Sequence, residues 1–174
     1  MHNPVVLGLG SNKSTMRNAS MLTPCMLLYE ACVALSDFLS QIRFSSIYRT
    51  KPMYVENQED FLNMAVYGFF EGTPEILLQK TQAVENKFGR NRDCEIKNGP
   101  RSLDIDIELF GNRHVTAPDL HIPHQKLTER AFVLIPMLEI LDESTEIKDR
   151  AFYMNCLRNL DTKDTVQFYK SFSL

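Results

Sequence analysis

The spacing of apolar and polar positions predicts the order of elements in the first half of the chain. Residues 5–9 form a short apolar run that ends in a Gly-Ser-Asn turn, which is typical of a buried first strand. Apolar residues at helical spacing over 19–39 predict a helix, and Pro24 requires that helix to begin or bend near it. Residues 42–49 alternate with period two and predict a half-buried strand.

The pattern then predicts a second strand, helix and strand. Residues 61–70 form a strand candidate, and the Thr-Pro-Glu of 73–75 supplies a cap and a first-turn proline for a helix that ends at Gly89. Strict alternation over 103–110 predicts the next strand. This order predicts an α+β fold of the ferredoxin-like βαββαβ type, an antiparallel sheet with its helices on one face.

The rest of the chain is predicted to be helical and appended to this unit. Helices are expected over 129–141 and 151–160. No internal repeat and no linker divides the sequence, so residues 1–174 are expected to form a single domain. Two polar connections, 50–60 and 90–101, are longer than tight turns need, and ordered loops of this length are often functional.

Composition and charge exclude several classes of protein. Of the 174 residues, 44% are hydrophobic and 10% aromatic, which excludes a disordered chain because such chains cannot offset their ordering entropy. The net charge of −3 excludes a globally basic nucleic-acid coat and leaves only a local basic patch open, so we expect no nucleic-acid partner. No apolar stretch reaches ~18 residues, so we expect no membrane partner.

The cysteines and the start of the chain indicate a compartment. Cys25, Cys32, Cys94 and Cys156 show neither a C-x-x-C pair nor zinc-ligand spacing. The first residues lack the basic segment and long apolar run of a signal peptide. A reducing cytoplasm is therefore the expected location.

Two carboxylates on a predicted strand are the sharpest candidate for chemistry. Asp104 and Asp106 are two residues apart, so their side chains share one face of the strand. Adjacent carboxylates repel unless a cation lies between them, and hard oxygen ligands suit Mg²⁺. A solvated polar face explains this short motif about equally well.

The preceding loop strengthens the interpretation as a phosphate site. Arg90, Arg92, Lys97 and Arg101 place four cations directly before the carboxylate strand. Arginine binds phosphate oxygens bidentately and keeps its charge, so cations beside a paired-carboxylate metal site suit a polyphosphate. For each arginine singly, a surface ion pair within a solvated loop is a serious alternative.

Other residues are ambiguous on the residue pattern alone. His124 is either a phosphate donor or a loop histidine, and Phe61 and Phe132 are core residues by default. Asn63 lies within a predicted strand, where a buried amide needs hydrogen-bond partners.

Residues 99–107, Gly-Pro-Arg-Ser-Leu-Asp-Ile-Asp-Ile, resemble the signature of the 6-hydroxymethyl-7,8-dihydropterin pyrophosphokinase family. The resemblance covers about residues 5 to 141. Further blocks match in family order at 10–12, 45–50, 61–66, 85, 89–90, 109–111, 123–124 and 130–133. A match over many blocks is far more specific than a lone pair of aspartates.

This resemblance implies a ferredoxin-like fold and a reaction. Family members transfer the β,γ-pyrophosphate of ATP to the hydroxymethyl group of the dihydropterin and release AMP, in folate biosynthesis. The resemblance therefore implies an ATP- and Mg²⁺-dependent diphosphokinase that uses two Mg²⁺ ions, with ATP and the pterin as its small-molecule partners. It leaves open an association with other folate-pathway enzymes.

The resemblance also implies a role for individual residues. Asp104 and Asp106 match the ligands of the two Mg²⁺ ions, and Arg90 and Arg101 match the catalytic cations that hold the transferring phosphates. Matches to the ATP site are Glu85, Arg92, Ile107, His124 and Arg130, and matches to the pterin site are Thr50, Met53, Phe61, Asn63 and Phe132. The chain departs from common family residues at Asn98, Asp119, His121 and Gln125, which we expect to tune affinity.

Two other classes of function compete with this interpretation. A ferredoxin-like RNA-binding module would need exposed aromatic side chains and a basic surface, and the acidic net charge and an expected central position for the Asp104–Asp106 strand argue against it. A regulatory domain that senses a small molecule would leave ATP unchanged, and it has no need of paired carboxylates and clustered arginines.

Overall fold

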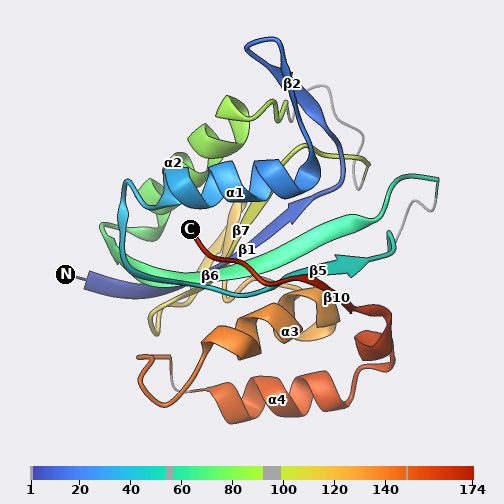
Figure 1. Cartoon of the computed structure of the whole chain (residues 1–174). Coiled ribbons are helices and arrows are strands. Elements are labelled where there is room, and N and C mark those ends of the chain that lie inside the picture. Colours follow the sequence, from blue (N-terminus) through green and yellow to red (C-terminus); the bar gives the residue numbers. More distant parts are fainter. Residues whose placement is uncertain (1, 54–56, 92–98, 148) are drawn as a thin grey trace.

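The computed structural model describes residues 2–53, 57–91, 99–147 and 149–174, and it forms one sheet with helices on both faces (Figure 1). Helices α1 (Pro24–Leu35) and α2 (Pro74–Lys87) cover one face. Helix α3 (Ala131–Ile140) covers the other, and α4 (Arg150–Arg158) packs against α3 on the side away from the sheet. The helices expected near the C-terminus therefore form a layer of their own.

The sheet is built around β1 and β6, and every pairing among its described strands is antiparallel. Its order is β10-β5-β6-β1-β7, with β4 also paired to β6. The strands are β1 (His2–Ser11), β4 (Leu39–Phe44), β5 (Ile47–Thr50), β6 (Phe61–Glu71), β7 (Asp104–Phe110) and β10 (Gln167–Lys170). The expected mixed fold with an antiparallel sheet is confirmed. The expectation that the Asp104–Asp106 strand is central was wrong, because β7 is the last described strand on its side.

The helix predicted over 19–39 begins later and ends earlier than expected, since α1 ends at Leu35 and Leu39 already belongs to β4. Residues before it form a hairpin of β2 (Thr15–Arg17) and β3 (Ser20–Leu22), and α1 starts at Pro24. Proline lacks an N–H and fits only the first turn of a helix, where Thr23 caps the end by accepting a hydrogen bond from the Met26 N–H at 3.4 Å.

The strand predicted over 42–49 is two strands, β4 and β5. Ser45 separates them and bonds to β6 on its own: its N–H donates to the Ala65 carbonyl at 3.0 Å, and its hydroxyl accepts from the Ala65 N–H at 2.8 Å. The Glu139 carboxylate of α3 accepts a hydrogen bond from the Ser46 N–H at 3.0 Å, which fixes the break against the helix.

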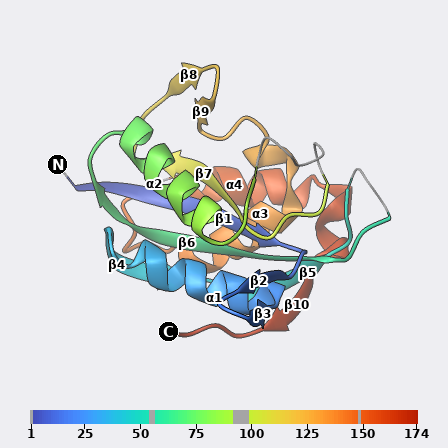
Figure 2. The same cartoon turned by 90° about the horizontal axis from the view of Figure 1, so that it is seen from above.

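Short elements complete the fold. The hairpin of β8 (Val115–Ala117) and β9 (Leu120–Ile122) lies beside β7 (Figure 2). Two 3₁₀ turns, η1 (Leu127–Glu129) and η2 (Asp161–Thr165), precede α3 and β10. In the described part of the chain, no helix is long and apolar enough to cross a membrane.

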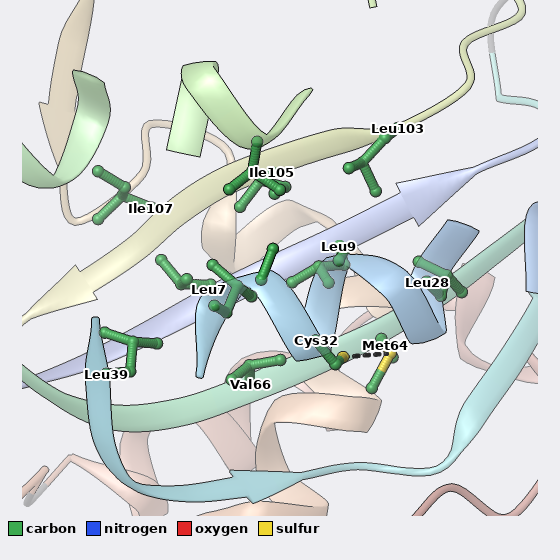
Figure 3. Packing of buried hydrophobic residues seen from close by; sticks show 14 of the residues in the cluster. Leu7, Leu9, Leu28, Cys32, Leu39, Met64, Val66, Leu103, Ile105 and Ile107 are labelled. Carbon is green, nitrogen blue, oxygen red and sulfur yellow. Dashed lines mark hydrogen bonds between the residues drawn. The ribbon is translucent and has the colours of Figure 1, made fainter. Parts of the chain in front are cut away.

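Two apolar cores hold the layers together. One lies between the sheet and α1 and α2, and Leu7, Leu9 and Val66 of the sheet belong to it together with Leu28 of α1 (Figure 3). The other lies between the sheet and α3 and α4. Alternate side chains of each central strand therefore enter opposite cores, and this alternation determines which side chains of β7 are free to form a site.

Candidate active site

Strand β7 directs three carboxyl groups to the face covered by α3. Ile105 and Ile107 belong to the core beneath α1 and α2, so Asp104, Asp106 and Glu108 point the opposite way. A cavity of about 260 Å³ lies over these three side chains.

This cavity gathers most of the predicted site residues from distant parts of the chain. The predicted residues in its lining are Thr50, Met53, Phe61, Asn63, Arg90, Arg101, Asp104, Asp106, His124, Arg130 and Phe132. Glu85 and Ile107 are not in the described lining, and Arg92 and Asn98 lie outside the described residues. Pterin-side and phosphate-side candidates thus share one cavity.

Three arginines surround the aspartate pair. Asp104 is held by two of them, with Oδ1 3.1 Å from Arg90 Nη1 and Oδ2 2.5 Å from Arg101 Nη1. Arg130 Nη1 lies 3.5 Å from Asp106 Oδ2. The arrangement holds one carboxylate tightly and leaves the other more open, since the Asp106 side chain is 35% exposed.

Asp106 resists ionisation in this arrangement. Partial removal of Asp106 from water by the surrounding protein, followed by repulsion from the neighbouring Asp104, raises the pKa of Asp106 to about 7. A divalent cation between the two carboxylates removes that repulsion, so the pair has the chemistry of a metal site. No cluster of three His, Cys, Asp or Glu side chains able to hold a metal occurs in the described ranges, so water and substrate oxygens would have to complete the coordination shell.

His124 is placed to donate rather than to carry charge. Burial, together with the positive charge of Arg130, lowers the pKa of His124 to about 4, so the ring is neutral near pH 7. Its Nδ1 accepts a hydrogen bond from the Lys126 N–H at 3.2 Å, which leaves the ring proton on Nε2. The ring is thus a neutral donor at the cavity wall.

Glu108 is a third carboxyl group that the sequence analysis missed. Its side chain is completely buried, and within the described part of the chain neither oxygen has a hydrogen-bond partner. Burial, followed by repulsion from Asp106, raises its pKa well above the ordinary glutamate value. A Cβ at Gly8 on β1 would lie 2.8 Å from Glu108 Oε1, so the glycine makes room for the carboxyl group. The continued alternation after Asp104 and Asp106 was the available signal.

We expect Glu108→Gln to stabilise the fold near pH 7. A glutamate whose pKa is raised in the folded state lowers the stability of the protein as pH increases above the unfolded pKa of about 4.3. The reason is that the glutamate ionises in the unfolded chain but stays protonated in the folded one. Replacing the buried acid with an amide that does not ionise should raise the free energy of unfolding at pH 7, and should change it less near pH 4. Urea unfolding at both pH values measures this. Lower stability of the variant at pH 7 would show that the carboxyl group has a stabilising partner.

Glu85 and Ile107 lie on the other side of β7. Glu85 is buried at the end of α2, where its Oε1 accepts a hydrogen bond from the Ile105 N–H at 2.8 Å. Its carbonyl accepts from the Arg90 N–H at 3.0 Å. Glu85 therefore fixes the start of β7 and the backbone of Arg90 together.

The predicted pterin side combines an amide with two aromatic rings. Asn63 on β6 is buried, and its Nδ2 donates to Thr50 Oγ1 at 2.9 Å. The Arg101 guanidinium lies 5.3 Å from the centre of the Phe61 ring. The Arg130 guanidinium lies 5.6 Å from the centre of the Phe132 ring. Each ring thus contacts one of the arginines that face the carboxylates.

Comparison with known proteins identifies the family. The model of the 7,8-dihydro-6-hydroxymethylpterin-pyrophosphokinase (HPPK) family matches residues 6–142. The chain belongs to the HPPK family. A Bacillus subtilis relative, 2-amino-4-hydroxy-6-hydroxymethyldihydropteridine pyrophosphokinase, is 37% identical over 143 residues, which are 82% of this chain and 81% of the relative. The Aquifex aeolicus protein of the same name is 35% identical over 136 residues, 78% of this chain and 79% of that protein.

Other HPPK relatives are larger. An Arabidopsis thaliana "Folate synthesis bifunctional protein" is 35% identical over 138 residues, which are 79% of this chain and only 27% of that protein. The crystal structure of Plasmodium falciparum HPPK-DHPS superposes with a TM-score of 0.58 at 14% identity, over 97% of this chain and 48% of that one, and shows a shared fold. The expected HPPK family and its pyrophosphokinase activity in folate biosynthesis are confirmed at this level.

Proposed function

We propose that the cavity holds ATP and 6-hydroxymethyl-7,8-dihydropterin together, and that the β,γ-pyrophosphate passes from one to the other. The bond between the α-phosphate bridging oxygen and the β-phosphorus breaks, a bond from the hydroxymethyl oxygen to that phosphorus forms, and AMP leaves. The observation that carries this proposal is the aspartate pair with its three arginines in one cavity with Phe61, Asn63 and Phe132.

Asp104 and Asp106 are the proposed ligands of two Mg²⁺ ions. Bound Mg²⁺ supplies charge neutralisation and orientation of the phosphates. The arginines act directly: Arg90 and Arg101 are proposed to bind the transferring phosphates, with Arg130 beside them. One carboxylate of the pair is proposed to accept the proton of the hydroxymethyl group.

The position of β7 supports an ATP site that uses both of its faces. β7 is the last described strand on its side of the sheet, and two proposed ATP-site residues bond its backbone there: the Glu85 carboxylate accepts from the Ile105 N–H, and the His124 N–H donates to the Glu108 carbonyl. We propose that the triphosphate lies on the cavity side with His124 and Arg130, with Arg92 contributing from the preceding loop. The nucleoside then lies toward Glu85 and Ile107.

The pterin is proposed to lie between Phe61 and Phe132. Flat heterocycles stack well on aromatic faces, and the buried Asn63 amide can bond the polar edge of the ring. The Thr50 hydroxyl orients that amide. Met53, which is 47% exposed, borders the opening of the cavity. A ligand without a polar edge would leave the Asn63 amide desolvated and unpaired. The pocket therefore favours a planar ring with donors and acceptors on one edge.

Further proposals concern the whole chain. We propose that the strand order β5-β6-β1-β7 is the ferredoxin-like arrangement, and that residues 1–174 act as one domain. The proposed compartment is the reducing cytoplasm, in keeping with the free thiols of Cys25, Cys32 and Cys156. The proposed partners are the two small-molecule substrates, without nucleic acid or membrane. Larger relatives named for folate synthesis support an association with other enzymes of that pathway.

We expect pterin to bind more tightly when ATP and Mg²⁺ are present. Bound Mg²⁺ neutralises the aspartate pair and the nucleotide orders Arg101, which contacts Phe61, so part of the ordering entropy is already lost before pterin binds. Calorimetric titration of pterin, with and without Mg²⁺ and a non-hydrolysable ATP analogue, should show about a 5- to 150-fold gain in affinity. Failure to bind either ligand would contradict the proposed function; equal pterin affinities would show two independent subsites.

A further inference from the structure

We infer that Asn12 is a positioning residue that couples the ATP side of the cavity to the pterin side. The inference rests on the proposed function and adds to it the residue that transmits occupancy of one subsite to the other. Asn12 follows the last residue of β1 and is 3% exposed. It is not in the described lining of the cavity, so it acts through its neighbours.

The Asn12 side chain bonds to both segments that border the cavity. Its Oδ1 accepts a hydrogen bond from the Arg101 N–H at 2.8 Å. Its Nδ2 donates to Gln58 Oε1 and to the Glu59 carbonyl, both at 3.0 Å. One amide thus joins the end of the connection before Phe61 to the end of the connection before β7.

Backbone hydrogen bonds from the end of β1 also hold the carbonyl group of Arg101. The N–H groups of Asn12 and Lys13 both donate to the Arg101 carbonyl at 3.1 Å. The Ser11 hydroxyl donates to the Ser102 carbonyl at 2.5 Å. Both polar groups of the Arg101 backbone are therefore held by the end of β1.

These bonds connect groups that are proposed to touch different substrates. The Arg101 side chain binds Asp104 at 2.5 Å, on the phosphate side. Glu59 lies two residues before Phe61, on the pterin side. A displacement of Arg101 by bound phosphate is therefore transmitted through Asn12 to the segment that carries Phe61.

Only a side chain with both an acceptor and two donors can make this set of bonds. Aspartate is nearly the same shape and keeps the acceptor for the Arg101 N–H, but an ionised carboxylate cannot donate to Gln58 or Glu59. Asn12→Asp therefore separates the two halves of the link. Asn3→Asp is the matched control, because Asn3 Nδ2 donates to the Phe70 and Gly72 carbonyls at 3.5 and 3.3 Å, at the opposite end of β1.

The experiment measures coupling rather than rate. Pterin is titrated calorimetrically into wild type, Asn12→Asp and Asn3→Asp, each with and without Mg²⁺ and a non-hydrolysable ATP analogue. We expect the wild type and Asn3→Asp to gain 5- to 150-fold in pterin affinity, and Asn12→Asp to keep at most about half of the wild-type gain, because the direct contact of Arg101 with the Phe61 ring remains. The affinity of each variant for the ATP analogue should stay within about threefold of wild type.

A second variant covers the case in which Asn12→Asp does not fold. Gln58→Leu removes one acceptor and leaves the bonds of Asn12 to Arg101 and Glu59, so the gain in pterin affinity should fall by part of its wild-type value. The inference would be overturned if Asn12→Asp and Gln58→Leu both kept the wild-type gain in pterin affinity. If Asn12→Asp is unfolded, the wild-type gain in Gln58→Leu alone would overturn it. So would uncoupled binding of the two ligands to the wild type. If the wild type binds neither ligand, the proposed function fails and the inference falls with it.

Discussion

Chelation of divalent metal ions should reduce turnover to background, and added Mg²⁺ should restore it. Without a cation, the Asp104–Asp106 pair repels the triphosphate, and repulsion within the pair, which raises the pKa of Asp106, opposes its full ionisation. The measurement is the initial rate of pterin-dependent ATP consumption with excess chelator, before and after Mg²⁺ is returned.

The chelated protein must remain folded for this result to count. The control is the melting temperature of the ligand-free protein with and without chelator. The two values should agree, since a metal that binds only together with ATP does not stabilise the ligand-free protein. Asp106→Asn should show the same loss of turnover in the presence of Mg²⁺. Full activity in excess chelator would contradict the role given to the two aspartates.

Arg101→Ala should lower kcat about a hundredfold while changing pterin affinity much less. The Arg101 guanidinium lies beside Asp104 and is assigned to the charge that develops on the transferring group, so its contribution is greatest in the transition state. Loss of one charge-assisted donor of this kind costs about 3 kcal/mol of transition-state stabilisation. Steady-state kinetics with each substrate varied separates kcat from the two KM values.

Two other variants define the result for Arg101. Arg101→Lys keeps the charge without the bidentate fork, so its rate should lie between those of the wild type and the alanine variant. Arg43→Ala removes an arginine that pairs with Asp142 at 2.9 Å on an exposed surface, and it should leave the rate unchanged. A wild-type rate in Arg101→Ala would mean that this arginine serves only the loop.

Much of the fold could be predicted from apolar spacing, and the errors have local causes. The helix predicted over 19–39 is too long at its start because Leu22 continues the apolar pattern, although it belongs to a hairpin that precedes Pro24. The split at Ser45 depends on contacts with Ala65 and Glu139, which spacing along one strand does not reveal. Strand β10 pairs with β5, far earlier in the chain, and apolar spacing along 167–170 does not reveal that pairing.

The candidate site was predictable where chemistry repeats along one element. Alternation alone places Asp104 and Asp106 on one face, and the same rule extends to Glu108. The rings of Phe61 and Phe132 came only from the resemblance to a family, because an aromatic residue in a strand or helix is by default a core residue. The Gly-Ser-Asn turn contains Asn12 but does not reveal its role, since its side-chain partners are 46, 47 and 89 residues away in sequence.

The identity of the nucleotide product tests the central claim most directly. The protein is incubated with ATP, Mg²⁺ and 6-hydroxymethyl-7,8-dihydropterin, and the products are separated by chromatography. The account predicts AMP in equal amount to a pterin that carries two phosphates, with neither formed when pterin is omitted. ADP with a singly phosphorylated pterin, or unchanged ATP in the presence of bound pterin, would contradict it.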